Sequence, residues 1–326
     1  MTGPKAGSGT GSSEATAARP GNGGVPEAPD AWTVLNLILW SAEYLRTKGV
    51  DRARLDGEHL LAHALGMKRL DLYLQYDRPL AREELDAFRP LLKRRARREP
   101  LQYILGHQPF RELDLEVDGR VLIPRPETEV LVGEVLGWVE AREDGGALDA
   151  LDVGTGSGAI ALSLALEGPF RRVVGTDPAP EALELAARNR AAAGLDGKVE
   201  LRAGADYEGL EPDEQFDVIV SNPPYVARGE RAELEPEIVE WEPAIALFAG
   251  EDGLDVVRRL VAGAPGRLRP DGLLALEVGS GQVGAVRRML ESAETWKDVE
   301  VKADLTGRER VVTAKCSRPD GPEPTT

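Results

Sequence analysis

Short apolar segments alternate with helix-like segments along residues 147–316, and this alternation constrains the fold more than any other feature of the sequence. It is typical of an open, mostly parallel sheet with helices on both faces, and we therefore expect an α/β, Rossmann-like domain. The expected strands are 147–154, 171–177, 199–206, 216–225, 272–279 and 309–316. The expected helices are 159–168, 180–194, 253–268 and 282–293.

A smaller helical domain is predicted before this sheet, over residues 31–105, and a chain of 326 residues has room for both. Apolar residues recur at helical spacing in three segments, 31–50, 56–66 and 80–99. Pro90 is expected to break or kink the third segment.

A hairpin linker is predicted over residues 106–126, ahead of the second domain at 127–315. Apolar and polar residues alternate on each side of Asp118-Gly119, and this dipeptide favours a two-residue hairpin turn. Beyond the linker, Thr128 is expected to cap a helix that starts near Glu129.

Both ends of the chain are predicted to be disordered tails, residues 1–30 and 316–326, because they contain little that could be buried. Met1 is not followed by the apolar region of a secretory signal, and no apolar run approaches the ~20 residues of a membrane span. Cys316 is the one cysteine, which excludes an intrachain disulfide. These features fit a reducing, cytoplasmic setting without a membrane partner.

The net charge of −16 is unevenly placed. Residues 1–118 carry 17 basic and 17 acidic side chains, so the whole deficit lies in residues 119–326. Nucleic-acid enzymes usually present a positive surface to phosphates, so we do not expect direct nucleic-acid binding. The basic run "KRRARRE", residues 93–99, is either a contact surface for an acidic partner or RNA, or a solvated helix face, which is the favoured interpretation.

His59 and His63 stand four residues apart, on one face of a helix, as two metal ligands could. No third ligand lies near them in the sequence, and the pattern is not H-E-x-x-H. We expect a structural role and no metal.

A glycine-rich turn, "LDVGTGSG", follows the first strand of the second domain and predicts a cofactor site. Its glycines allow a sharp turn and a close approach of the backbone to a ligand. Their spacing is G-x-G-x-G, which differs from the dinucleotide fingerprint. Asp152, just before them, would repel a pyrophosphate and suit a cationic ligand.

Two further residues complete the expected cofactor site. Asp177 ends the second strand, where doubly wound sheets place an acid against ribose hydroxyls, although it could also cap the next helix. Tyr207 could pack against adenine, with Asp206 bonding the amino group, or could be an aromatic residue at the edge of the core. S-adenosylmethionine, with a ribose, an ammonium and no phosphate, fits such a site.

The segment "NPPY", residues 222–225, stands where the expected strand 216–225 reaches the ligand-binding edge of the sheet. The Asn222 side-chain carbonyl and the Pro223 carbonyl are two acceptors on a stiff segment, and Tyr225 offers a flat face. Together they match a planar NH₂ group on an sp² carbon. Held by both N–H bonds, that nitrogen could attack a methyl sulfonium in line. The alternative is a proline-rich turn that only closes a strand.

The chain resembles the N5-glutamine methyltransferases of peptide chain release factors, the HemK type, over about residues 35–315. The resemblance rests on "EPLQYILG", "LIPRPETEVLV", "LDVGTGSGAIALSLA", "VSNPPY", "WEPAIALFAGEDGLD" and "DLTGRERVV", in that order. NPPY alone is shared with adenine N6-methyltransferases of DNA, whereas the whole set is far more specific.

The resemblance implies a helical domain that grips the release factor and a domain that binds S-adenosylmethionine, with S-adenosylhomocysteine as the product. The residues it implies at the cofactor are Gly154, Thr155, Gly156, Ser157, Gly158, Asp177, Tyr207 and Asn222. The residues it implies at the substrate amide are Asn222, Pro223, Pro224 and Tyr225. Tyr207 departs from the family pattern, which often has tryptophan at this position.

The implied substrate is the glutamine of the Gly-Gly-Gln (GGQ) loop of release factors. One alternative is the same chemistry on a ribosomal-protein glutamine or on adenine N6 of nucleic acid. Another is a binding module that keeps the fold and transfers nothing, although the intact glycine turn and NPPY segment argue against it.

Overall fold

The computed structural model describes residues 1, 3, 32–142 and 146–317. By its internal contacts the chain divides into two compact units, with the division between Leu92 and Lys93. The predicted tails lie outside the described residues, except for Met1, Gly3, Cys316 and Ser317. No helix in the described ranges has the length and apolar character needed to cross a bilayer.

The first unit is helical, as predicted. It contains α1 (Val34–Thr47), α2 (Ala53–Ala64), α3 (Arg69–Tyr73) and the first part of α4 (Arg82–Arg95). Its core is built from buried apolar side chains that recur at helical spacing: Ile38, Leu45, Leu60, Leu61, Leu72 and Phe88. The helix α4 continues through Pro90, so the expected break is wrong.

The second unit begins with the end of α4, from Lys93. It continues with α5 (Leu101–Leu105) and a two-stranded antiparallel hairpin, β1 (His107–Phe110) and β2 (Leu113–Glu116). The hairpin turn lies at Arg111 and Glu112, not at Asp118-Gly119 as predicted. Asp118 instead shapes a later turn, because its carboxylate accepts the N–H of Arg120 at 3.1 Å.

A seven-stranded sheet forms the centre of this unit, in the order β5-β4-β3-β6-β7-β9-β8. Its strands are β3 (Leu148–Val153), β4 (Phe170–Asp177), β5 (Val199–Ala203), β6 (Phe216–Ser221), β7 (Leu268–Glu277), β8 (Trp296–Ala303) and β9 (Glu309–Cys316). The pairs from β5 to β7 are parallel, whereas β9 pairs antiparallel with β7 and β8. This confirms the predicted mostly parallel sheet.

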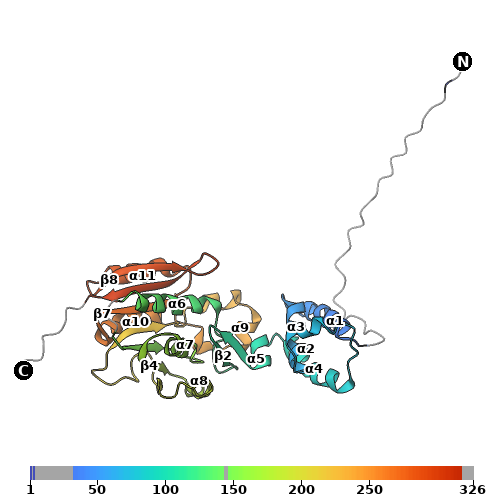
Figure 1. The fold of residues 1–326 in the computed structure, drawn as a ribbon. Helices are drawn as coiled ribbons and strands as arrows, with labels where there is room; N and C mark the ends of the chain where they lie inside the picture. Colours follow the sequence, from blue (N-terminus) through green and yellow to red (C-terminus); the bar gives the residue numbers. More distant parts are fainter. Residues whose placement is uncertain (2, 4–31, 143–145, 318–326) are drawn as a thin grey trace, which may run out of the picture. The chain divides into compact units, whose positions relative to one another are not determined.

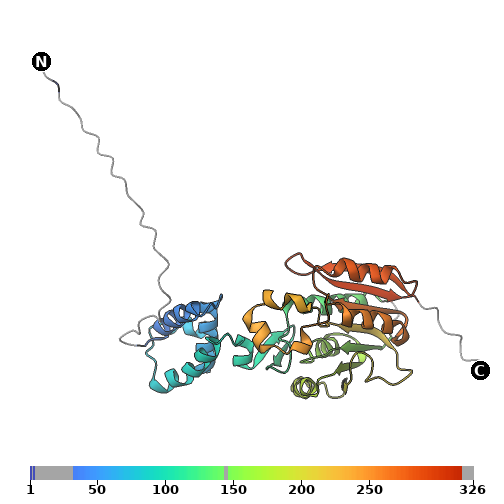
Figure 2. The same ribbon diagram turned by 180° about the vertical axis from the view of Figure 1, so that it is seen from behind.

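Helices cover both faces of the sheet (Figures 1 and 2). Ala150 packs with α6 (Pro126–Glu140) and α7 (Ala159–Glu167) on one face. Its neighbour Leu151 packs with α10 (Asp255–Arg267) and α11 (Val283–Glu291) on the other, as the two-residue repeat of a strand requires. The remaining helices of this unit are α8 (Pro180–Ala192), α9 (Pro236–Trp241) and two short 3₁₀ turns, η1 (Arg228–Glu233) and η2 (Ala244–Ala246).

Two boundaries differ from the predictions. The helix α6 begins at Pro126, so Thr128 lies inside its first turn and does not cap it. The last strand includes Cys316, which is fully buried and therefore part of the sheet and not of a tail. The strand β8 was not predicted, although the alternation of Val299 and Val301 with charged residues indicates it.

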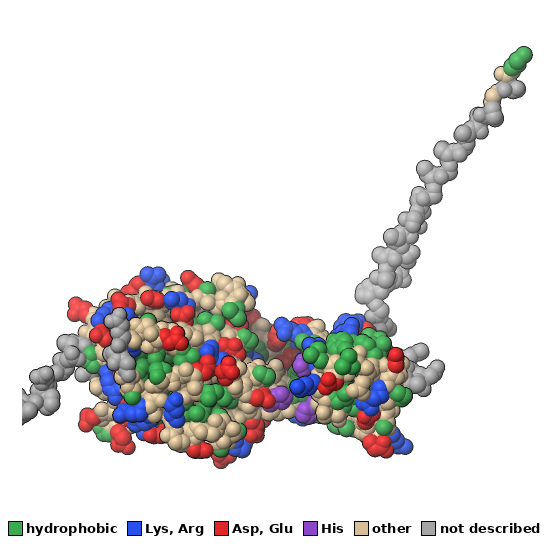
Figure 3. Space-filling view, viewed as in Figure 1, with side chains coloured by type: hydrophobic (Ala, Val, Ile, Leu, Met, Phe, Trp, Pro, Cys, Tyr) green, Lys and Arg blue, Asp and Glu red, His purple; other side chains and the backbone are tan. Residues whose placement is uncertain are grey.

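Three arginines of the basic run at residues 93–99 pair with carboxylates of the same unit, whereas Lys93 and Arg97 are exposed. Arg94 donates to Glu99 at 2.9 Å, and Arg95 and Arg98 both donate to Glu237, at 2.9 and 2.6 Å. Because Arg95 is buried, the favoured interpretation of a solvated helix face is wrong for it. On the face of the second unit seen in Figure 3, basic and acidic side chains lie interspersed.

Candidate active site

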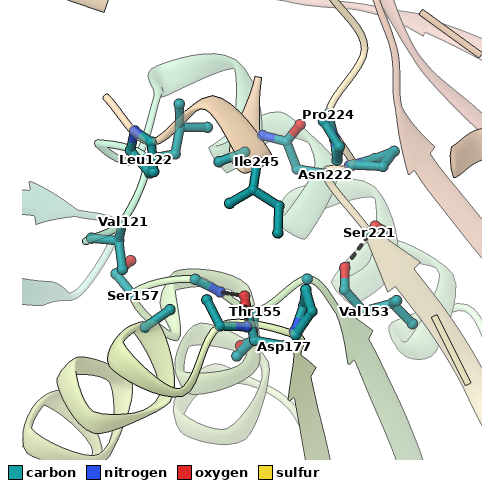
Figure 4. A pocket seen from close by; sticks show the side chains of 18 of the residues that line it. Val121, Leu122, Val153, Thr155, Ser157, Asp177, Ser221, Asn222, Pro224 and Ile245 are labelled. Carbon is teal, nitrogen blue, oxygen red and sulfur yellow. Dashed lines mark hydrogen bonds between the residues drawn. The ribbon is translucent and has the colours of Figure 1, made fainter. Parts of the chain in front are cut away.

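A cavity of about 290 Å³ opens in the second unit at the carboxyl ends of β3, β4 and β6. This is the edge at which parallel sheets of this kind bind ligands. Figure 4 shows Asn222 and Pro224 across the cavity from Thr155 and Asp177, with Ile245 extending into it.

The glycine turn after β3 forms one wall of this cavity. Gly154 and Gly156 have φ angles of 75° and 55°, and a Cβ on either would meet no atom within 4 Å. The backbone N–H groups of Gly154 and Thr155 both donate to the Thr176 carbonyl at 2.9 Å, which fixes the turn to β4. The turn therefore offers exposed backbone without side chains in the way.

Gly158, the last glycine of the turn, does not line the cavity. It caps α7 with a φ of 85°, and a Cβ there would stand 3.1 Å from Leu162 Cδ1. Gly158 therefore allows the glycine turn to pack closely against the first turn of α7.

Asp177 lies at the end of β4 and lines the cavity. Its Oδ2 accepts the N–H of Gly156 and its Oδ1 accepts the N–H of Ala179, each at 2.9 Å. The N-cap residue of α8 is Ala179, and no side chain caps this helix, so the expected capping role of Asp177 is wrong. The two contacts of Asp177 instead tie the glycine turn to β4 and fix the residue that precedes α8. Burial raises the pKa of this carboxyl, and each oxygen keeps a lone pair for a further donor.

Asp152 is not among the cavity-lining residues, contrary to the expectation that it suits a cationic ligand. It is fully buried beneath the turn, where its Oδ2 accepts Thr155 Oγ1 at 2.6 Å and the N–H of Ala161 at 3.1 Å. Burial raises its pKa to about 7. Through these two hydrogen bonds, Asp152 stabilises the glycine turn and its connection to α7.

Asn222, Pro223 and Pro224 line the cavity opposite the glycine turn. The Asn222 Nδ2 donates to Thr128 Oγ1 at 2.9 Å. Its Oδ1 is buried and has no hydrogen-bond partner among the described residues. An unpaired buried acceptor is costly, so this oxygen is suited to receive a donor from a bound molecule.

Tyr225 is not among the cavity-lining residues. Its backbone carbonyl accepts Gln282 Nε2 at 2.8 Å, which anchors the end of the NPPY segment to the start of α11. Gly253 packs against the same carbonyl so closely that a Cβ there would lie 2.1 Å from the oxygen.

Tyr207 does not line the cavity either, and the predicted adenine contact does not fit its position. It packs in the core beside α10, against Gly263, and its hydroxyl donates to the Leu260 carbonyl at 2.8 Å. Its neighbour Asp206 does line the cavity, where Arg259 Nε donates to its Oδ2 at 2.5 Å. The core-edge alternative for Tyr207 is the one that agrees with the structure.

Two residues connected to Asn222 were not predicted: Thr128, which lines the cavity, and Glu277, which contacts Thr128. Thr128 Oγ1 donates to Glu277 Oε2 at 2.7 Å while it accepts Asn222 Nδ2. The "LIPRPETE" motif contains Thr128, which was the available signal; nothing local in the sequence indicated Glu277.

The two histidines that stand at helical spacing form no metal site. Within residues 32–142 and 146–317, no cluster of three or more His, Cys, Asp or Glu side chains could hold a metal ion.

Comparison with known proteins agrees with this geometry. The family model for the methyltransferase small domain matches residues 139–244, and the model for the PrmC N-terminal domain matches residues 36–106. The solved catalytic domain of hMettl16, in complex with the MAT2A 3′UTR hairpin 6, shares the fold with a TM-score of 0.52, at 18% identity over 71% of this chain and 82% of that one. The matching methyltransferase family model and the curated relatives show that the protein is a methyltransferase.

Curated relatives identify the family within this class. The release factor glutamine methyltransferase of Geobacter sulfurreducens is 46% identical over 88% of this chain and 98% of its own. Those of Rhodopirellula baltica and Rhodospirillum rubrum are 38% and 40% identical, over 86% and 93% of this chain and 96% and 91% of theirs. The chain belongs to the family of release factor glutamine methyltransferases.

Proposed function

We propose that the protein transfers a methyl group from S-adenosylmethionine to the side-chain amide nitrogen, N5, of the glutamine in the GGQ loop of peptide chain release factors. Family membership supports the reaction and the substrate class. The observation that carries the chemistry is the unpaired Oδ1 of Asn222 on the cavity wall. The alternatives, a ribosomal-protein glutamine or adenine N6, have no such support from the relatives.

The cavity suits the cofactor on three observations. The two glycines without a Cβ leave room for a ligand against the backbone, and Asp177 presents carboxylate oxygens beside them. Asp206 and Arg259 line the same cavity near the end of β5, where we place the adenine. When bound there, S-adenosylmethionine supplies an electrophilic methyl carbon and yields S-adenosylhomocysteine.

The protein has to make a poor nucleophile attack that carbon. The amide lone pair is delocalised into the neighbouring carbonyl, so the nitrogen becomes reactive only as it turns tetrahedral. We assign Asn222 Oδ1 and the Pro223 carbonyl as acceptors of hydrogen bonds from the two N–H groups of this nitrogen. These contacts favour the tetrahedral geometry and direct the lone pair at the methyl carbon. A nitrogen–carbon bond forms, the carbon–sulfur bond breaks, and the proton leaves the nitrogen to solvent.

Release factor methylation can be tested directly. The full chain is incubated with a release factor and isotope-labelled S-adenosylmethionine, and the GGQ peptide is analysed by mass spectrometry. We expect one methyl group on the glutamine side chain. A release factor with GGN in place of GGQ serves as the matched substrate control.

Absence of label on that glutamine would refute the substrate, and label on the GGN factor or on DNA alone would favour the alternatives. No calorimetric affinity for S-adenosylmethionine would revive the non-catalytic binding module.

A further inference from the structure

A buried chain of three polar side chains runs from the core to the NPPY segment. Glu277 lies at the end of β7 and is 1% exposed, and Thr128 lies in the first turn of α6 and is 4% exposed. Thr128 Oγ1 lies 2.7 Å from Glu277 Oε2 and 2.9 Å from Asn222 Nδ2. This series of hydrogen bonds therefore ends at Asn222, the residue that we assign to the substrate amide.

The direction of these hydrogen bonds follows from the number of protons. A carboxylate can only accept, and a hydroxyl has one proton to donate. When Glu277 is ionised, the Thr128 hydroxyl donates its one hydrogen bond to the Glu277 carboxylate. The hydroxyl oxygen can then only accept a hydrogen bond from its other neighbour, Asn222. Asn222 must then present its NH₂ to Thr128, which leaves Oδ1 on the opposite side of the carboxamide.

We propose that Thr128 and Glu277 are positioning residues, which hold the Asn222 carboxamide in the one orientation that presents an acceptor to the substrate NH₂ group. The inference rests on the proposed function. The two ends of a carboxamide have nearly the same shape, so packing alone distinguishes them poorly. In the reversed orientation, Asn222 would set a donor against the N–H bonds of the substrate, and the transition-state contact would be lost.

The surroundings of Glu277 determine the pH at which it is ionised, and so the pH at which Thr128 holds Asn222 in the proposed orientation. Burial raises its pKa to about 7, while the hydrogen bond from Thr128 lowers it. The other titratable or charged groups that act on it are Arg125 and Glu127 at the start of α6, Tyr225 after β6 and Arg310 on β9. Since the ionised form fixes the orientation, kcat should rise with pH as Glu277 loses its proton near pH 7.

Substitution of Thr128 tests the positioning role. Thr128→Val keeps the shape and removes the hydroxyl, so we expect kcat to fall roughly 10-fold or more, as when an orienting partner behind a functional group is removed. The affinity for S-adenosylmethionine, measured by calorimetry, should stay within about twofold. Thr128→Ser restores the hydroxyl and should recover most of kcat.

Thr313→Val is the matched control, because Thr313 is a buried threonine on β9 that does not line the cavity. Its kcat should equal that of the wild type. A Thr128→Val enzyme as fast as the wild type would overturn the proposal, and so would equal losses in Thr128→Val and Thr128→Ser. An inactive wild type would instead refute the proposed function, so the two failures are distinguishable.

The pH profile of kcat provides a second test, because a purely structural role of Glu277 would not change this profile. Glu277→Gln cannot ionise, so the rise of kcat across pH 6 to 8 seen in the wild type should disappear. A rise that persists unchanged in Glu277→Gln would overturn the assignment of Glu277.

Discussion

Asp177 Oδ2 accepts the backbone N–H of Gly156 at 2.9 Å, so a single carboxylate joins the glycine turn after β3 to the end of β4. Its other oxygen holds the N–H of Ala179 at the start of α8. The residue that we assign to the ribose is thus also the residue that shapes the cavity wall.

Asp177→Asn should therefore weaken cofactor binding. An amide has only one acceptor oxygen, so one of the two backbone N–H groups, or the ligand, loses its partner. We expect the calorimetric affinity for S-adenosylmethionine to fall by about 10-fold, which corresponds to ~1.4 kcal/mol. The exposed Asp213→Asn is the control, and an affinity equal in both variants would contradict the assignment.

Asn222→Ala should separate cofactor binding from turnover. The substitution removes the acceptor that we assign to the substrate amide and leaves the glycine turn intact. We expect kcat to fall about 10²–10³-fold, the usual effect of removing one transition-state hydrogen-bonding group, with cofactor affinity nearly unchanged. Single-turnover methylation of the release factor measures this, and unchanged turnover would count against the mechanism.

The parts of the site that the sequence predicted are those carried by local motifs. The glycine turn and the NPPY segment each occupy a few consecutive residues at the end of a strand, so their place at the sheet edge follows from the strand pattern alone. Thr128 and Glu277 are different, because they stand 94 and 55 residues from Asn222 in the sequence. Only the pairing of β6 with β7, and the packing of α6, brings the three together.

The errors have a similar origin in competition between local and tertiary preferences. Asp118-Gly119 favours a hairpin turn, but the chain turns at Arg111-Glu112. Arg111 Nε donates a hydrogen bond to Glu167 Oε1 at 2.8 Å, a tertiary contact that stabilises this turn. Tyr207 follows a sheet strand, as an adenine-binding residue would, yet its ring is drawn into the core beside Gly263. The contact partners, Glu167 for Arg111 and Gly263 for Tyr207, lie far away in the sequence, so the neighbouring residues could not indicate them.

Gly175→Ala should disturb the glycine turn from behind. A Cβ at this position in β4 would stand 2.9 Å from Thr155 Oγ1, which donates to the buried Asp152. We expect the displacement of Thr155 to lower the free energy of unfolding by about 1–3 kcal/mol and to weaken cofactor binding. Thermal unfolding with and without S-adenosylmethionine measures both effects.

Gly197→Ala is the matched control for this variant, because a Cβ there would meet nothing within 4 Å and the backbone is not left-handed. If both glycine variants bind the cofactor equally well, Thr155 does not support the turn as described.

Asp152→Asn should change how stability depends on pH. The buried carboxyl has a pKa of about 7 in the folded chain, against a model-peptide value of 3.8, so the folded state keeps its proton where the unfolded state has lost it. Between about pH 4 and pH 7, rising pH therefore stabilises the unfolded state, at up to about 1.4 kcal/mol per pH unit. Below that window both states are protonated and above it both are ionised, so this contribution levels off.

The asparagine variant has no such titration, so its stability relative to the wild type should increase steadily as the pH rises through this window. Urea unfolding of both proteins at pH 5, 6, 7 and 8 measures the difference, and Asp213→Asn controls for the removal of an exposed charge. Buried acids that do not interact with Asp152 titrate equally in both proteins and cancel in the comparison. The charge of Asp177 raises the pKa of Asp152, so Asp152→Asn/Asp177→Asn, compared with Asp177→Asn alone, isolates the titration of Asp152. A difference between Asp152→Asn and the wild type that stays constant with pH would show that Asp152 is ionised throughout, and its support of the turn would then be ionic.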